Sequence, residues 1–155
     1  LKRIRAQGGF VLVDSGNYEA TRRDDDGWKP EDFELALQGI PHDWVYCFDE
    51  MTPSRDRKRA VGQVIAAVER DRKLTKAPVL PIVHAPATPS KGYDLTILPA
   101  VVRDVADQLQ PPMIALAERE LGRGLIQRAR TMDASETSLI GYPFINRFIS
   151  SGQGL

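Results

Sequence analysis

The fold is decided by the stretch Trp44-Val-Tyr-Cys-Phe48, an apolar run that is followed immediately by Asp49. A short, continuous apolar run rich in aromatic and β-branched residues is typical of a parallel strand that is buried on both faces. Three further apolar runs have a similar form, at residues 10–13, 79–83 and 113–117. The sequence therefore predicts four buried parallel strands.

An ionisable side chain follows each run. Asp14, Asp49, His84 and Glu118 stand at intervals of 35, 35 and 34 residues. This period leaves room for one strand, one helix and two loops, so it indicates repeated βα units. Because the carboxyl ends of parallel strands meet at one edge of an α/β fold, where ligands bind, we expect these four side chains to face a common site.

Helices are predicted between and after the strands, over residues 30–38, 52–74, 95–109 and 125–132. In the second helix, an apolar stripe faces the sheet; its members are Ala60, Val61, Val64, Ile65 and Val68. Four consecutive βα units define an α/β protein, built either as a small open doubly wound sheet or as about half of a (β/α)8 TIM barrel. A whole barrel takes roughly 250 residues, so half of one fits this length.

We expect one partial barrel domain over residues 1–132 and an irregular tail over residues 133–155. Hydrophobic residues make up 42% of the chain and charged residues 27%, as in ordinary globular proteins. Lys plus Arg and Asp plus Glu both number 21, so no global basic field points to nucleic acid. The single cysteine, Cys47, excludes an internal disulfide and a Cys-rich zinc site, and its apolar neighbours predict a buried, inert thiol.

No apolar run is long enough to span a bilayer, and no signal-peptide hydrophobic segment precedes Gly8. These features predict a cytoplasmic protein without a membrane partner. The chain starts with Leu1 rather than methionine, which suggests that it begins inside a larger protein.

Each polar residue at a strand end has a structural alternative to a functional role. Asp14 can act as a general acid or base, or it can form an Asx turn or a helix cap. Asp49 is favoured over Glu50 as the site residue because it continues directly from the strand, although it can also cap the next helix. His84 can bind a ligand or metal and shuttle protons, or be hydrogen-bonded structure. Glu118 lies in a charged segment that suggests an ion-pair network.

Two segments resemble motifs of one enzyme family. Phe10-Val-Leu-Val-Asp-Ser-Gly-Asn-Tyr-Glu19 resembles a strand followed by DSGGFQ, and Val45-Tyr-Cys-Phe-Asp-Glu-Met-Thr-Pro53 resembles FDECTP. Both motifs belong to the tRNA-guanine transglycosylase superfamily, and the resemblance covers about residues 9–132. It implies a (β/α)8 barrel and exchange of guanine in a nucleic acid for a 7-deazaguanine base, as in queuosine formation, through a covalent aspartyl–sugar intermediate. Members act on tRNA, and a bacterial branch acts on DNA.

The resemblance implies a role for each matching residue. Asp14 matches the family aspartate that contacts the base and works in proton transfer, and Ser15 matches its neighbour in the pocket. Asp49 matches the aspartate that reads the amino and ring N–H groups of the purine. A carboxylate suits that task because it accepts two parallel hydrogen bonds.

Three further positions depart from the family pattern. Tyr18 lies in Gly-Asn-Tyr instead of Gly-Gly-Phe and can still stack on the base. His84 stands where the family usually has glutamine and can still hydrogen-bond a base carbonyl. Glu118, with Ala117, stands where the family has a Gly-Gly-Leu strand end. These changes suggest a divergent branch.

The family nucleophile, an aspartate on a later strand, and its Cys/His zinc cluster have no counterpart in these 155 residues. The chain alone is therefore predicted to be inactive, without a bound cofactor, and truncated before the nucleophile. Its implied partners are tRNA or DNA and a purine-like base.

Two other functions remain open. Aspartate, histidine and glutamate at successive strand ends also serve metal-dependent barrel hydrolases and isomerases. A half barrel also exposes strand edges and apolar surface, so the chain can instead be a non-catalytic module that pairs with a second copy or a missing C-terminal half.

Overall fold

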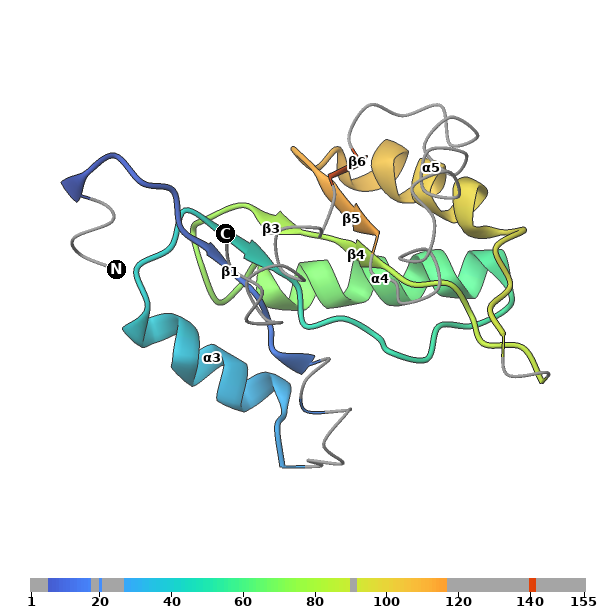
Figure 1. Ribbon diagram of the computed structural model, residues 1–155, viewed down its shortest axis with the longest axis horizontal. Coiled ribbons are helices and arrows are strands. Elements are labelled where there is room, and N and C mark those ends of the chain that lie inside the picture. The colour runs from blue at the N-terminus through green and yellow to red at the C-terminus, as the bar shows by residue number, and fades with distance from the viewer. Residues whose placement is uncertain (1–5, 18–19, 21–26, 90–91, 117–139, 142–155) are drawn as a thin grey trace, which may run out of the picture.

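The computed structural model describes residues 6–17, 20, 27–89, 92–116 and 140–141. Within them, short parallel strands alternate with helices (Figure 1). The strands are β1 (Leu12–Val13), β2 (Trp44–Tyr46), β3 (Val79–Leu80), β4 (Ile82–Val83), β5 (Ile114–Leu116) and β6 (Ile140–Gly141). The helices are α3 (Pro30–Gly39), α4 (Arg57–Asp71) and α5 (Leu98–Leu109). This mixture of helices and parallel strands confirms the α/β class.

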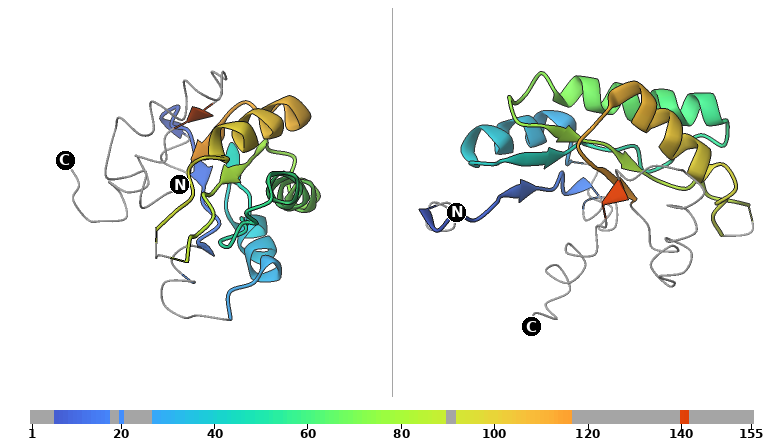
Figure 2. Two further views of the ribbon diagram at one scale, coloured as in Figure 1. Left: turned by 90° about the vertical axis from the view of Figure 1, so that its right-hand side faces the viewer. Right: turned by 90° about the horizontal axis from the view of Figure 1, so that it is seen from above.

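The strands lie beside one another in the order in which they occur along the chain. One parallel sheet has the order β1-β2-β3 and the other has the order β4-β5-β6. Residues 79–83 belong to both sheets, through β3 on one side and β4 on the other. The three helices α3, α4 and α5 all lie on the same side of the strands (Figure 2).

The run at residues 79–83 was expected to form one strand, and the structure divides it at Pro81. The carbonyl of Pro81 accepts a hydrogen bond from the Ala115 N–H at 2.9 Å, so this residue faces β5. Proline has no N–H to donate in return, and the ladder is therefore interrupted there. Hydrogen bonding continues on the side that faces β2, where the Cys47 N–H donates to the Leu80 carbonyl at 3.0 Å.

The described side chains of β3, β4 and β5 are all buried, as expected for parallel strands covered on both faces. The stripe on α4 is confirmed for four of its five members, because Ala60, Val61, Val64 and Val68 are buried, whereas Ile65 is only partly buried. Its members Ala60, Val61 and Val64 pack with α5 in an apolar cluster that also contains Val83 from β4, whereas Val68 packs in a second cluster with residues of β2 and β3. On the other flank, Phe33 and Leu37 of α3 pack with Val45 and Phe48.

The helix ends follow local chemistry. Helix α3 begins with Pro30, and the Lys29 N–H donates to the Asp32 carboxylate at 3.0 Å. Helix α5 ends at Leu109, before Gln110 in a left-handed conformation (φ 43°). Pro111 and Pro112 follow it.

The start of α4 was wrongly expected near Thr52. The helix begins at Arg57, because Asp56 is the capping residue and its side chain accepts a hydrogen bond from the Arg59 N–H at 2.9 Å. Upstream, the Ser54 N–H donates to the Gln63 side chain at 2.9 Å, which holds this segment outside the helix.

Three expectations fall at least partly outside the described residues. They are the helix at 125–132, the division between residues 132 and 133, and most of the tail. From the tail, only β6 is described, and it adds a parallel strand beside β5. The longest described helix, α4, has 15 residues, and none of the described helices is long and apolar enough to cross a membrane.

Candidate functional site

Three side chains from three neighbouring strand ends meet around Asp49. Ser15 follows β1, Asp49 follows β2, and His84 directly follows β4. One carboxylate oxygen of Asp49 accepts a long hydrogen bond of 3.4 Å from the Ser15 hydroxyl, and the other bonds to Nε2 of His84. Asp49 is only 8% exposed, so these bonds satisfy a carboxylate that has left bulk water.

The loop after β1 supplies a second contact to Asp49 that the sequence did not predict. The side-chain amide of Asn17 donates to the Asp49 carbonyl at 2.7 Å, and the Asn17 N–H lies 3.3 Å from the Ser15 hydroxyl. Between them, Gly16 has φ +72°, a conformation that glycine adopts without strain. The Ser-Gly-Asn order, with a glycine between two short polar residues directly after a strand, was the available signal.

Trp28 fixes this loop from the opposite side. Its indole N–H donates to the Ser15 carbonyl at 2.9 Å, and its ring lies 3.7 Å from the position that a Cβ on Gly16 would take. Both Ser15 and Asn17 are buried. The loop is therefore positioned by hydrogen bonds to the Ser15 carbonyl and the Ser15 hydroxyl, and by packing of Trp28 against Gly16.

The residue before Asp49 is held by the end of α4. Asp71, which is fully buried, accepts a 2.6 Å hydrogen bond from the Phe48 N–H. Arg70 donates to the Phe48 carbonyl at 2.7 Å and bonds to Asp71 at 2.6 and 2.9 Å, and its guanidinium lies 5.6 Å from the centre of the Phe48 ring. The Asp71 carboxylate raises the pKa of Arg70. The N–H and the carbonyl of Phe48 are thus both hydrogen-bonded to charged side chains, which fixes the backbone position of the next residue, Asp49.

The sequence did not single out Asp71, although its position carried a signal. Asp71 stands three residues after Val68 and continues the buried stripe of α4. A carboxylate at a core-facing position has to find donors, since an unpaired buried charge costs several kcal/mol. What the pattern could not indicate was the identity of the donor, which lies 23 residues earlier in the chain.

Asp14 lies exposed at the end of β1, in contrast to Ser15. Burial, and then the charge of Asp14, raise the pKa of Tyr46 to about 12. Tyr46 therefore stays protonated at neutral pH. Of the six residues proposed from the sequence, the structure brings together Ser15, Asp49 and His84; Tyr18 and Glu118 lie outside the described residues.

Cys47 was expected to be buried, and this is confirmed: its exposure is 0%. Burial, followed by the charge of Asp49, raises the pKa of the thiol, and the smaller effect of the Ile82 hydrogen bond in the opposite direction does not offset this. The thiolate is the reactive form of cysteine, so this position is chemically inert in the folded state.

A metal centre would need more ligands than this group supplies. Asp49 and His84 are two potential ligands, and nowhere in the described part of the chain do three or more His, Cys, Asp or Glu residues gather closely enough to hold an ion. The chemistry available from the described group is hydrogen bonding and proton transfer by a carboxylate, an imidazole and a hydroxyl.

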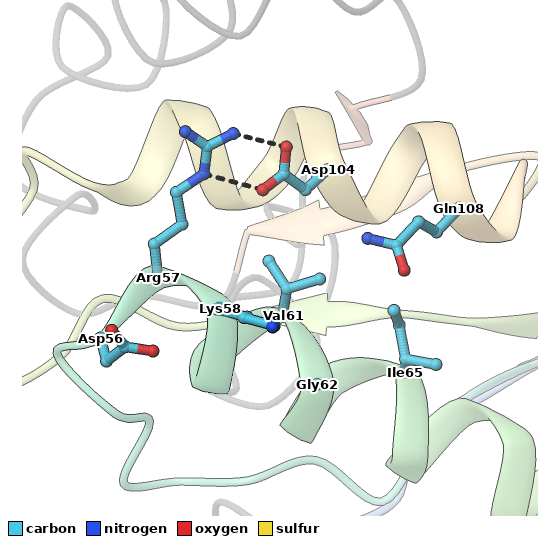
Figure 3. A pocket seen from close by; sticks show the side chains of 8 residues that line it. All are labelled: Asp56, Arg57, Lys58, Val61, Gly62, Ile65, Asp104 and Gln108. Carbon is cyan, nitrogen blue, oxygen red and sulfur yellow. Dashed lines mark hydrogen bonds and ion pairs between the residues drawn. The ribbon is translucent and has the colours of Figure 1, made fainter.

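A separate open groove of about 560 Å³ lies between α4 and α5 (Figure 3). Arg57 and Asp104 span its two walls through a bidentate ion pair at 2.7 and 2.6 Å. The pair lowers the pKa of Asp104. None of the groove's lining residues belongs to the group around Asp49; they are Asp56, Arg57, Lys58, Val61, Gly62, Ile65, Asp104 and Gln108.

No known protein-family profile matches this chain, and no curated protein is significantly similar to it in sequence.

Proposed function

We propose that this chain forms part of a (β/α)8-type barrel whose strand ends bind a purine-like base, as in a divergent transglycosylase that exchanges guanine for a 7-deazaguanine base in tRNA or DNA. Sequential parallel strands with helices on one side are the arrangement that such a barrel requires. A doubly wound sheet, by contrast, reverses its strand order at a switch point.

One observation carries the proposal. Asp49 is a buried carboxylate at the carboxyl end of a central strand, and it is held by donors from the two neighbouring strand ends. An ionised carboxylate has about four acceptor sites, of which Ser15 and His84 use one each. The remaining sites suit the adjacent N–H groups of a guanine-type edge, which a carboxylate accepts in parallel.

The proposal also limits what these 155 residues do by themselves. We propose that they bind the base but do not exchange it, because the sequence offers no counterpart of the nucleophilic aspartate or of the Cys/His cluster that the resemblance implies. Incubation with guanine-containing tRNA or DNA and labelled 7-deazaguanine is expected to give no incorporation. Clear incorporation would show that the nucleophile is within this chain.

Base binding is tested by calorimetric titration with 7-deazaguanine, with adenine as the competing purine. Asp49→Asn preserves the shape of the side chain but exchanges one acceptor oxygen for an NH2 donor. A hydrogen bond to a charged group is worth about 1.5–3 kcal/mol, so affinity should fall about 10- to 150-fold. Asp107→Asn is the matched control, because Asp107 is exposed on α5. Equal binding of adenine, or an unchanged affinity in Asp49→Asn, would overturn the proposal.

Elemental analysis separates this proposal from the metal-dependent alternative. We expect no stoichiometric metal in the purified protein. A metal ion present at one per chain, and lost in Asp49→Ala but not in Asp107→Asn, would favour a metal-dependent enzyme instead.

A further inference from the structure

The two ring nitrogens of His84 differ, because one is hydrogen-bonded to the protein and the other, called the open nitrogen below, has no hydrogen-bond partner among the described residues. Nε2 bonds to the Asp49 carboxylate, and within the described residues Nδ1 has no hydrogen-bond partner. The His84 side chain is 14% exposed, so it is neither sealed in the core nor freely solvated. The open nitrogen is therefore the atom of this histidine that can meet a ligand.

The bond to Asp49 decides which nitrogen carries the proton. An ionised carboxylate only accepts hydrogen bonds, so Nε2 has to be the donor. In a neutral imidazole the other nitrogen then has a lone pair and no hydrogen. Asp49 is itself held by Ser15 and, at its carbonyl, by Asn17, so the carboxylate that orients the imidazole is fixed in place.

We propose that Asp49 holds His84 in the Nε2–H tautomer, so that Nδ1 is a hydrogen-bond acceptor that selects ligands presenting an N–H or O–H group. This deepens the proposed function, on whose site it rests. Together with the free lone pairs of Asp49, it makes the site a cluster of acceptors. Ligands with adjacent donors, such as an aminopurine edge, fit this cluster, whereas phosphate and carboxylate groups meet lone pairs and negative charge.

This assignment differs from the role expected for His84 from the sequence, which was a hydrogen bond to a base carbonyl. A carbonyl oxygen needs a donor, and neutral His84 in this tautomer offers none at Nδ1. If Nδ1 takes the proton of the bound group, the electron pair stays on the ligand atom, and the resulting imidazolium is stabilised by the adjacent carboxylate.

The chain contains its own reference for a test. Its second histidine, His42, has Nδ1 at 2.6 Å from the Ile40 carbonyl and Nε2 at 2.7 Å from the Thr75 hydroxyl. A carbonyl only accepts, so neutral His42 has to carry its proton on Nδ1. The two histidines should therefore be opposite tautomers, with both nitrogens of His42 occupied and one nitrogen of His84 open.

The first measurement is a long-range ¹H–¹⁵N correlation spectrum of the ligand-free protein, recorded at alkaline pH where the ¹⁵N shifts themselves show both rings to be neutral. We expect Nε2–H for His84 and Nδ1–H for His42. Asp49→Asn should convert His84 into a mixture of tautomers, since an amide both donates and accepts, and leave His42 unchanged. An Nδ1–H tautomer for His84 in the unmodified protein would overturn the proposal.

The second measurement tests whether Nδ1 is open, without any base. Diethyl pyrocarbonate modifies unprotonated imidazole nitrogens, and mass spectrometry reports the rate at each histidine. His84 should react at least tenfold faster than His42, and equal rates would refute an open Nδ1. Protection of His84 by 7-deazaguanine is then read separately. Rapid modification without protection would reject the proposed base while leaving the acceptor assignment in place.

Discussion

Replacing Asp71 with alanine should destabilise the protein and loosen the candidate site together. Asp71 accepts hydrogen bonds from the Phe48 N–H and from two nitrogens of Arg70, and it is fully buried. Removing one partner of a buried ion pair costs about 3–5 kcal/mol, because the other partner loses its counter-charge. The Arg70 side chain is 39% exposed and can turn to water, so we expect the low end, about 3 kcal/mol.

The measurement is urea unfolding followed by tryptophan fluorescence. With a slope of about 2 kcal/mol per molar urea, a loss of about 3 kcal/mol lowers the midpoint by about 1.5 M. Asp71→Asn keeps one acceptor for the Phe48 N–H and should lose about half as much. Asp107→Ala, at an exposed position of α5, should stay within about 0.5 kcal/mol.

A positional role for Asp71 requires a second effect. Below the urea transition, where Asp71→Asn is still folded, its His84 should show line broadening or a mixture of tautomers, because Phe48 directly precedes Asp49. A destabilisation of less than about 1 kcal/mol in Asp71→Ala would refute the energetic reasoning. A stability loss without any change at His84 would limit Asp71 to a role in stability.

Three other perturbations follow from the described packing and charges. Leu80→Ala should lower the free energy of unfolding by about 2–5 kcal/mol in urea unfolding, because Leu80 is fully buried and leaves a cavity. Cys47 should react with Ellman's reagent only after unfolding, since burial raises its pKa and suppresses the thiolate. Asp104→Asn should destabilise slightly at neutral pH, and less in high salt, because it breaks the surface ion pair with Arg57. The pair lowers the pKa of Asp104 in the folded protein. Its contribution to stability is therefore complete above the usual pKa of 3.8 and is lost as the pH falls through the lowered pKa. Thermal melts of Asp104→Asn and the parent protein should converge in that acidic range.

The elements that the sequence predicted well are those with local signals. Helix α3 was expected over residues 30–38 and extends over Pro30–Gly39, because a proline in the first turn followed by acidic residues marks a helix start. The buried stripe of α4 was predicted from its 3.6-residue periodicity. Each of these features depends on residues within a few turns of one another.

The start of α4 was missed because three polar residues compete as its cap. Thr52, Ser54 and Asp56 are all favourable capping residues, and propensity alone does not choose among them. The choice depends on the partners of the side-chain oxygens: the Thr52 hydroxyl donates to Glu50, and the Ser54 hydroxyl accepts from the Asp56 N–H. The Asp56 carboxylate is left to accept from the Arg59 N–H and so caps the helix.

The structure brings Ser15, Asp49 and His84 together at the carboxyl ends of the strands, but the even spacing could not tell which of two neighbouring side chains faces this group. Asp14 and Ser15 are consecutive, and successive side chains of an extended chain point to opposite faces. A spacing argument accurate to one residue therefore cannot separate them. The structure places Ser15 on Asp49 and leaves Asp14 exposed, because Gly16 at φ +72° and the indole of Trp28 fix the turn that follows.

The same reasoning explains why Asp49 and His84 were predicted as members of one site but not as a bonded pair. Their interval of 35 residues places each at the carboxyl end of its strand, which sets proximity. The bond itself depends on the backbone position of Asp49. This position is set by Arg70 and Asp71 of α4, which hydrogen-bond to the backbone of Phe48. The position of Asp49 is thus supported by a helix end that contributes no atom to the site, so weakening the contacts between α4 and Phe48 should loosen the bond to His84 and with it the tautomer proposed for this histidine.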